Sequence, residues 1–170
     1  MASEPLVTGS EALTLTVHSR HLRLRTGERL QFIDLTEAVA EEVRRSRVRH
    51  GLVCVQTLHT TTAVVVNENE PGLLEDMARV LEGLAPPGGG YRHDDLAGRP
   101  EVPPDEPPNG DAHCKAMLLS ASQTLSVQEA RMQLGRWQRI FLVELDGGRT
   151  RSVCVTVMGA AGGGRVGLRP

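Results

Sequence analysis

Residues 56–77 read QTLHTTTAVVVNENEPGLLEDM and contain most of the chain's unusual chemistry. His59 and three threonines come directly before the apolar run 63–66, a pattern typical of a buried strand with a polar entrance. Residues 67–70 follow with two amides and two carboxylates, and Pro71 after them is suited to the first turn of a helix. The stretch therefore predicts a strand, a turn and a helix start, with polar side chains at both ends of the strand.

Periodicity in the rest of the chain predicts two helices and several short strands. Residues 34–47 and 72–84 carry apolar side chains at helical spacing. Alternating patterns at 12–18 and 21–25 predict two strands or one bent strand. Alternating or apolar patterns also predict strands at 51–55, 124–127, 137–145 and 150–158. The turn signal at 146–148 predicts that the last two strands form a hairpin. Short strands in hairpin arrangement indicate the α+β class, with two helices packed on a mainly antiparallel sheet.

The length of 170 residues is ordinary for one domain, so we expect a single domain over residues 1–170. Residues 85–111 are rich in proline and glycine and predict a long loop inside it. The ends of the chain, 1–10 and 160–170, are of small, polar or glycine-rich composition and predict disorder.

Composition narrows the classes of partner. The net charge is −2 and aromatic residues make up 2% of the chain, so it has neither the basic surface nor the stacking platforms of a nucleic-acid binder. No apolar run approaches the roughly 20 residues of a membrane-spanning helix. The start of the sequence has no pattern of a secretory signal. We therefore expect a cytoplasmic protein that binds neither nucleic acid nor membrane.

Three histidines stand out by their context. His59 lies at a strand entrance, His93 lies beside two aspartates in the long loop, and His113 comes just after that loop. Imidazole is the commonest metal ligand, and three protein ligands with one open position form the usual catalytic zinc site. The three also have an ordinary interpretation, in which His59 caps a strand, His93 is solvated and His113 binds a helix end. Their spacing alone leaves both interpretations open.

Two further groups also have both a functional and an ordinary structural interpretation. Glu68 and Asp76, with Asn67 beside them, present oxygen ligands suited to magnesium, or they serve as helix caps and solvated residues. Arg149 and Arg151 flank the predicted turn and suit a phosphate or carboxylate, or they belong to the solvated face of a strand.

Taken together, these residues give the chain a resemblance to the YjbQ family, often named secondary thiamine-phosphate synthase enzymes. The resemblance covers about residues 13–159. Five blocks carry it: HTTTAVVVNENEPGLLED (59–76), YRH (91–93), AHCKAMLLSAS (112–122), LGRWQRIFLVELDGGRTR (134–151) and VMG (157–159). The chain departs from the family pattern at Ser120 and Ser126, where the family usually has a glycine and often a proline.

The resemblance implies an α+β fold that assembles as a homotrimer. It implies that His59, His93 and His113 converge near a subunit boundary as a catalytic site that holds a metal or an anion. The implied cofactor is a divalent metal, either zinc or magnesium, and the implied partner is a small phosphorylated molecule. The residues expected to bind the substrate are Thr60, Asn67, Glu68, Asp76, Arg149 and Arg151.

The activity implied by the family's name joins a pyrimidine pyrophosphate to a thiazole phosphate and releases pyrophosphate. Two alternatives stay open beside this transferase. One is a zinc-dependent hydrolase that uses the three histidines to activate water. The other is a trimer that binds a metal or ligand without catalysis.

Overall fold

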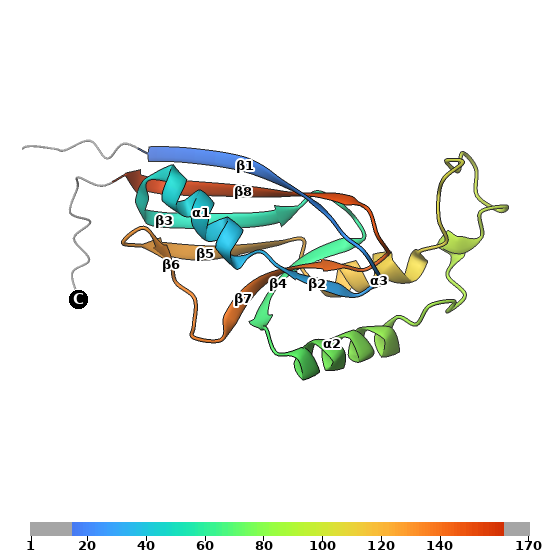
Figure 1. Ribbon diagram of the computed structural model, residues 1–170. Coiled ribbons are helices and arrows are strands. Elements are labelled where there is room, and N and C mark those ends of the chain that lie inside the picture. Colours follow the sequence, from blue (N-terminus) through green and yellow to red (C-terminus); the bar gives the residue numbers. More distant parts are fainter. Residues whose placement is uncertain (1–14, 162–170) are drawn as a thin grey trace, which may run out of the picture.

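The protein is described by a computed structural model in which residues 15–161 are placed, and its elements form two antiparallel sheets and three helices (Figure 1). The five-stranded sheet has the order β1-β8-β3-β5-β6, and the three-stranded sheet has the order β2-β7-β4. Together they confirm the α+β class and the antiparallel pairing. The strands are β1 (Leu15–Arg25), β2 (Gln31–Asp34), β3 (Val48–Thr57), β4 (Thr62–Glu68), β5 (Ser122–Gln128), β6 (Arg131–Met132), β7 (Gln138–Glu144) and β8 (Thr150–Ala161). The helices are α1 (Thr36–Ser46), α2 (Pro71–Leu84) and α3 (Gly110–Leu118), with a short 3-10 turn at Arg92–Asp94.

Two apolar clusters form the core. The larger lies between α1 and the strands, where Val43, Val53, Leu142 and Val155 are almost wholly buried. The smaller joins α2 and α3 to the three-stranded sheet through side chains such as Leu81, Ala112 and Phe141. The central stretch of the sequence spans both clusters, because Val64 belongs to the larger and Ala63 to the smaller. Burial on alternate sides of β4 thus fixes how the two layers meet.

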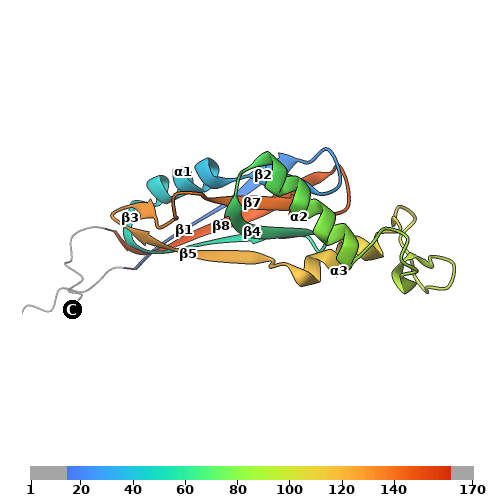
Figure 2. The ribbon, with the colours of Figure 1, turned by 90° about the horizontal axis from the view of Figure 1, so that it is seen from below.

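The prediction of two helices was wrong, because α3 makes a third. Its pattern is hard to read since Lys115, in the middle of the helix, is fully buried and paired with Asp111 one turn earlier at 2.6 Å. The helix begins inside the predicted loop 85–111, where the Gly110 amide donates to Asp94. The segment between α2 and α3 extends from one end of the molecule, beyond α3, in both ribbon views (Figure 2).

The predicted hairpin of the last two strands was also wrong. β7 is the central strand of its sheet and pairs with β2 on one edge and β4 on the other. No edge of β7 remains for β8, which instead lies between β1 and β3 in the other sheet. The turn at 146–148 therefore carries the chain from one sheet to the other.

The predicted disorder of the C-terminal end begins too early, because strand β8 extends to Ala161. Ala160 and Ala161 end β8 and pair with Leu15 and Val48, so the prediction was wrong for these two residues. Residues 1–10 and 162–170 lie outside the described part of the chain. Between residues 15 and 161, none of the helices has the length and apolar character needed to cross a membrane.

A close contact between two glycines sets the spacing of β3 and β8. Gly51 and Gly159 are partners in the ladder, and a Cβ atom on Gly51 would lie 2.0 Å from the Met158 carbonyl oxygen. Gly159 has a φ of +156°, and a Cβ there would lie 2.2 Å from the His50 carbonyl oxygen. Only glycine fits this crossing without moving the backbone.

We expect Gly51→Ala to lower the free energy of unfolding by about 3 kcal/mol, because the clash is with backbone that cannot rotate away. The matched control is Gly83→Ala in α2, where a Cβ meets nothing within 4 Å. It should raise stability by about 0.5–1 kcal/mol through helix propensity. Urea denaturation measures both, and equal effects of the two variants would contradict the assigned contact.

Candidate functional site

A polar pocket of about 450 Å³ collects most of the residues that the sequence singled out. We call it the histidine pocket, and four segments build it: the turn between β3 and β4, the segment before α3, α3 itself and the start of β8. Its walls are Leu58, His59, Thr60, Thr61, His93, Glu106, Pro107, Asn109, His113, Arg149 and Arg151. The three histidines, which are far apart in sequence, thus share one pocket.

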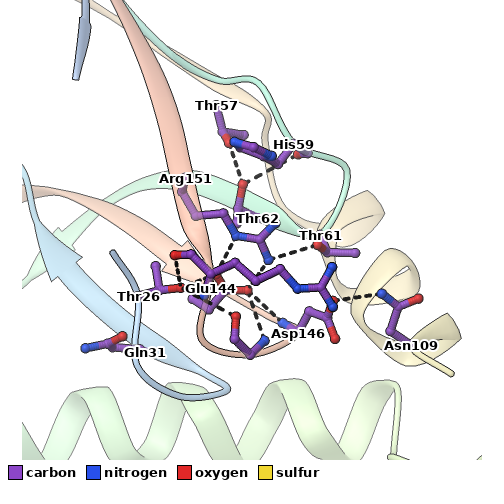
Figure 3. Close-up of polar contacts among 12 residues, drawn as sticks. Thr26, Gln31, Thr57, His59, Thr61, Thr62, Asn109, Glu144, Asp146 and Arg151 are labelled. Carbon is purple, nitrogen blue, oxygen red and sulfur yellow. Dashed lines mark hydrogen bonds and ion pairs between the residues drawn. The ribbon is translucent and has the colours of Figure 1, made fainter. Parts of the chain in front are cut away.

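A buried ion pair lies behind this pocket (Figure 3). Arg151 donates through Nε and Nη2 to the two oxygens of Glu144, each at 2.6 Å. Glu144 is fully buried and Arg151 is 4% exposed. Arg151 also donates to the Thr61 hydroxyl at 3.2 Å. Arg151 therefore holds the β3–β4 turn in place, and its Nε and Nη2 atoms are already engaged.

Further hydrogen bonds keep the Glu144 carboxyl ionised. Burial alone would raise its pKa, but donation from Arg151, from the backbone amide of Asp146 and from the Thr26 hydroxyl outweighs burial, so the pKa is lowered from its usual 4.5. A charge this deeply buried is tolerated only when its partners are complete.

His59 is held as a neutral imidazole. Its Nε2 accepts a hydrogen bond from the backbone amide of Ser152 at 2.8 Å, so this nitrogen carries no proton. Burial and the nearby charge of Arg151 lower the pKa of His59 below its usual 6.5, with Glu144 opposing them. The proton of the neutral ring must therefore be on Nδ1.

His93 and His113 form a second histidine group, with His93 in the 3-10 turn Arg92–Asp94 and His113 in α3. Their ring centroids are 4.7 Å apart, at an interplanar angle of 64°. His93 Nε2 lies 3.1 Å from Asn109 Oδ1 and 3.3 Å from Glu106 Oε1. Burial and neighbouring His93 lower the pKa of His113, against opposing effects of Asp146 and Glu106. Two such close rings cannot both become charged at low cost.

The expectation of metal binding is contradicted. Over residues 15–161, no group of three or more histidine, cysteine, aspartate or glutamate side chains lies where it could hold a metal ion. The hydrogen bonds give a physical reason, because His59 Nε2 is engaged by Ser152 and His93 Nε2 by Asn109. A shared role of the three histidines in catalysis stays a prediction.

The expected substrate-binding residues divide between two places. Thr60, Arg149 and Arg151 line the histidine pocket. Asn67 and Asp76 instead line a separate apolar pocket of about 320 Å³ between α2 and the three-stranded sheet, and Glu68 lines neither. The end of β4 does serve the helix start, where Glu70 accepts from the amides of Gly72 and Leu73.

Several residues of the site were missed by the sequence reasoning. Asn109 and Glu106 lie in a proline-rich loop with no pattern that marks them. Glu144 did have a signal, since it is a carboxylate within the apolar run IFLVEL of residues 140–145. A charge inside a buried strand requires a partner, and Arg151 was the nearby candidate.

Glu144→Gln should lower the free energy of unfolding at neutral pH by about 3 kcal/mol, because it leaves the Arg151 charge buried and unpaired. The folded-state pKa of Glu144 is lowered, so its contribution is present above 4.5 and is lost as the pH falls below that value. The difference between wild type and variant should therefore shrink in acid. Urea unfolding across this pH range measures it.

The matched control is Glu37→Gln, whose side chain is 84% exposed and lies 3.7 Å from Arg139. It should change stability by less than about 0.5 kcal/mol. A Glu144→Gln variant as stable as this control would show that the buried pair contributes nothing.

Comparison with known proteins places this arrangement in a family. Residues 20–160 match the family model YjbQ, described as UPF0047 protein YjbQ-like. A UPF0047 protein of Archaeoglobus fulgidus is 45% identical over 81% of this chain and 98% of its own length. UPF0047 protein YjbQ of Escherichia coli O157:H7 is 33% identical, over 88% and 96%.

Solved structures agree with the sequence relatives. A YbjQ-like protein of unknown function from Sulfolobus solfataricus has a TM-score of 0.77 at 30% identity, covering 86% of this chain and 99% of that one. An uncharacterized conserved protein of the YjbQ/UPF0047 family from Clostridium acetobutylicum has a TM-score of 0.71 at 33% identity, covering 81% and 98%.

These comparisons correct the expected function. The relatives are named UPF0047 proteins, and the Sulfolobus protein is named as one of unknown function, so the thiamine-phosphate synthase and transferase assignments have no support. The zinc-dependent hydrolase loses its basis with the three-histidine metal site. What the match over residues 20–160 does establish is descent, and the chain belongs to the UPF0047 family of YjbQ-like proteins.

Proposed function

We propose that the histidine pocket binds a small phosphorylated molecule through its phosphate group. The observation that carries this proposal is the set of donors in one pocket, where Arg149, three imidazoles and two threonine hydroxyls meet. Guanidinium, imidazole and hydroxyl groups are the side chains that bind phosphate oxygens. The volume of about 450 Å³ is within the usual range for small-molecule sites.

Arg149 is the cation in this pocket that is able to reach a ligand. Its side chain is 44% exposed, whereas Arg151 is occupied by Glu144. Arg149 Nη2 lies 2.7 Å from Asp146 Oδ2, and the guanidinium makes no other ion pair within residues 15–161. Asp146 is itself 8% exposed and thus fixes the arginine at the pocket wall.

Thr61 supports the proposal from the other wall. Its hydroxyl oxygen accepts from Arg151, so its proton is directed elsewhere and remains available to an acceptor. The side chain of Thr60 lies beside it in the same turn and is exposed. The turn therefore offers hydroxyl donors next to the neutral ring of His59.

Arg149→Gln should weaken phosphate binding by about tenfold, since a charge-assisted hydrogen bond contributes roughly 1.5 kcal/mol or more. Calorimetric titration with inorganic phosphate, and with a simple phosphate monoester, measures the affinity. The matched control is Arg139→Gln, because Arg139 has the same 44% side-chain exposure and lies outside the pocket. Equal affinities for the two variants, or no phosphate binding by the wild type, would contradict the proposal.

We also propose that the protein assembles as a homotrimer through the outer face of the five-stranded sheet. On this face Val17, Met158 and Leu52 are ladder neighbours on β1, β8 and β3. Each is more than 40% exposed, at 59%, 42% and 44%. The next ladder row on this face is small, with Ser19 beside Thr156, and it supports close packing of a second sheet. Occupation by further copies of the chain would bury these side chains.

Sedimentation velocity should give a mass three times that of the 18.4 kDa chain. Leu52→Lys should shift the protein to monomers, because it places a charge in the contact. Leu84→Lys on α2, where the side chain is 64% exposed, is the control and should leave the trimer intact. A monomeric wild type, or dissociation by the control alone, would contradict this interface.

A further inference from the structure

The orientation of the Asn109 amide is fixed by its neighbours. One end of the amide lies 2.8 Å from Asp146 Oδ2, and the other lies 3.1 Å from His93 Nε2. The Asp146 carboxylate, which pairs with Arg149, accepts hydrogen bonds and cannot donate them. The end toward Asp146 must therefore be the NH2 group, and the end toward His93 must be the carbonyl oxygen.

This orientation determines where His93 carries its proton. Nε2 faces two acceptors, the Asn109 oxygen at 3.1 Å and the Glu106 carboxylate at 3.3 Å. A ring nitrogen between two acceptors must donate, so Nε2 is protonated. In the neutral ring the lone pair is then on Nδ1, which makes no hydrogen bond within residues 15–161.

His59 has the opposite arrangement. Its Nε2 accepts from the Ser152 amide, so its proton is on Nδ1. The histidine pocket therefore contains two different imidazoles. Nδ1 of His93 has a lone pair that can accept a proton, whereas Nδ1 of His59 carries a proton that it can donate. The different proton positions of the two histidines follow from their hydrogen bonds to the Ser152 amide and to the Asn109 side chain.

We propose that Asn109 is a positioning residue that fixes the proton of His93 on Nε2 and thereby makes Nδ1 of His93 the general base of the histidine pocket. The inference rests on the proposed function, because the proton it accepts comes from the bound phosphorylated molecule. In the step, the ligand's O–H bond breaks, its electron pair stays on the ligand oxygen, and the proton forms a bond to Nδ1. The resulting imidazolium lies beside the Glu106 carboxylate, which stabilises the charge.

The first test reads the tautomers directly in ligand-free protein. Two-bond 1H–15N correlation spectra of 15N-histidine protein, recorded well above the ordinary histidine pKa of about 6.5 so that the rings are neutral, distinguish the two tautomers. We expect His93 protonated on Nε2 and His59 protonated on Nδ1. A wild-type spectrum with the His93 proton on Nδ1 overturns the proposal.

The second test removes the positioning group. Asn109→Leu keeps the approximate volume but offers His93 no oxygen, so His93 should change to a mixture of both tautomers. His59 should keep its Nδ1 proton in the same spectrum, which reports that the pocket is still folded. Asn69→Leu, at an exposed asparagine bonded to Asp34, is the matched control and should leave His93 unchanged. If His93 in folded Asn109→Leu still carries its proton on Nε2 alone, the positioning role is overturned. If the variant does not fold, the position of the His93 proton in the wild-type spectrum is the deciding result.

The two proposals fail in different ways. If wild-type tautomers are as expected and inorganic phosphate does not bind, the ligand assignment is wrong and the proton-accepting role toward it is lost, while the proton positions stand. If phosphate binds and His93 carries its proton on Nδ1, the proposed function stands and this inference alone is overturned. Asn109 also lines the pocket, so phosphate affinity in Asn109→Leu should fall by no more than about tenfold, which corresponds to the loss of one neutral hydrogen bond.

Discussion

The ion pair of Glu144 and Arg151 is the interaction on which the arrangement of the two sheets depends. Glu144 ends β7 in the three-stranded sheet, and Arg151 is the second residue of β8 in the five-stranded sheet, so the pair joins the sheets across the turn between them. Removing two charges from water is costly, and here the hydrogen bonds from Thr26 and the Asp146 amide complete the shell that offsets the cost. The same guanidinium reaches Thr61, so the connection of the sheets also fixes the pocket's wall.

Much of the fold followed from local pattern, because buried strands and amphipathic helices have short-range signatures. The stretch 56–77 formed the predicted strand and helix, with Glu70 capping the helix start as its position before Pro71 suggests. The assignment of strands to sheets did not follow, since a turn between β7 and β8 has the same residues whether it closes a hairpin or crosses between layers. Helix α3 was not predicted, because its buried residues include the ion pair of Lys115 and Asp111. A hydrophobic pattern does not reveal buried charged residues.

The sequence predicted which histidines form the candidate site, but it did not predict the chemical roles of their ring nitrogens. His59, His93 and His113 were grouped by context and family resemblance, and they do share a pocket. Their expected role as metal ligands was wrong because the outcome depends on which ring nitrogen each neighbour occupies. Those neighbours are a backbone amide at Ser152 and a side-chain amide at Asn109, and neither has a sequence signature. Arg151, which was predicted to bind the substrate, lines the pocket, and its bonds to Glu144 likewise have no sequence signature.

The histidine pocket has walls from two parts of the chain, and one of them is the segment between α2 and α3. His59 and Arg151 belong to the strands and their turn, whereas His93, Glu106 and Asn109 come from a segment that projects from one end of the molecule (Figure 1). Length changes in this segment leave the ladders of both sheets intact, because none of its residues pairs in them. Changes in this segment can therefore alter one half of the pocket, and with it the choice of ligand, without disturbing the strands and turn that carry His59.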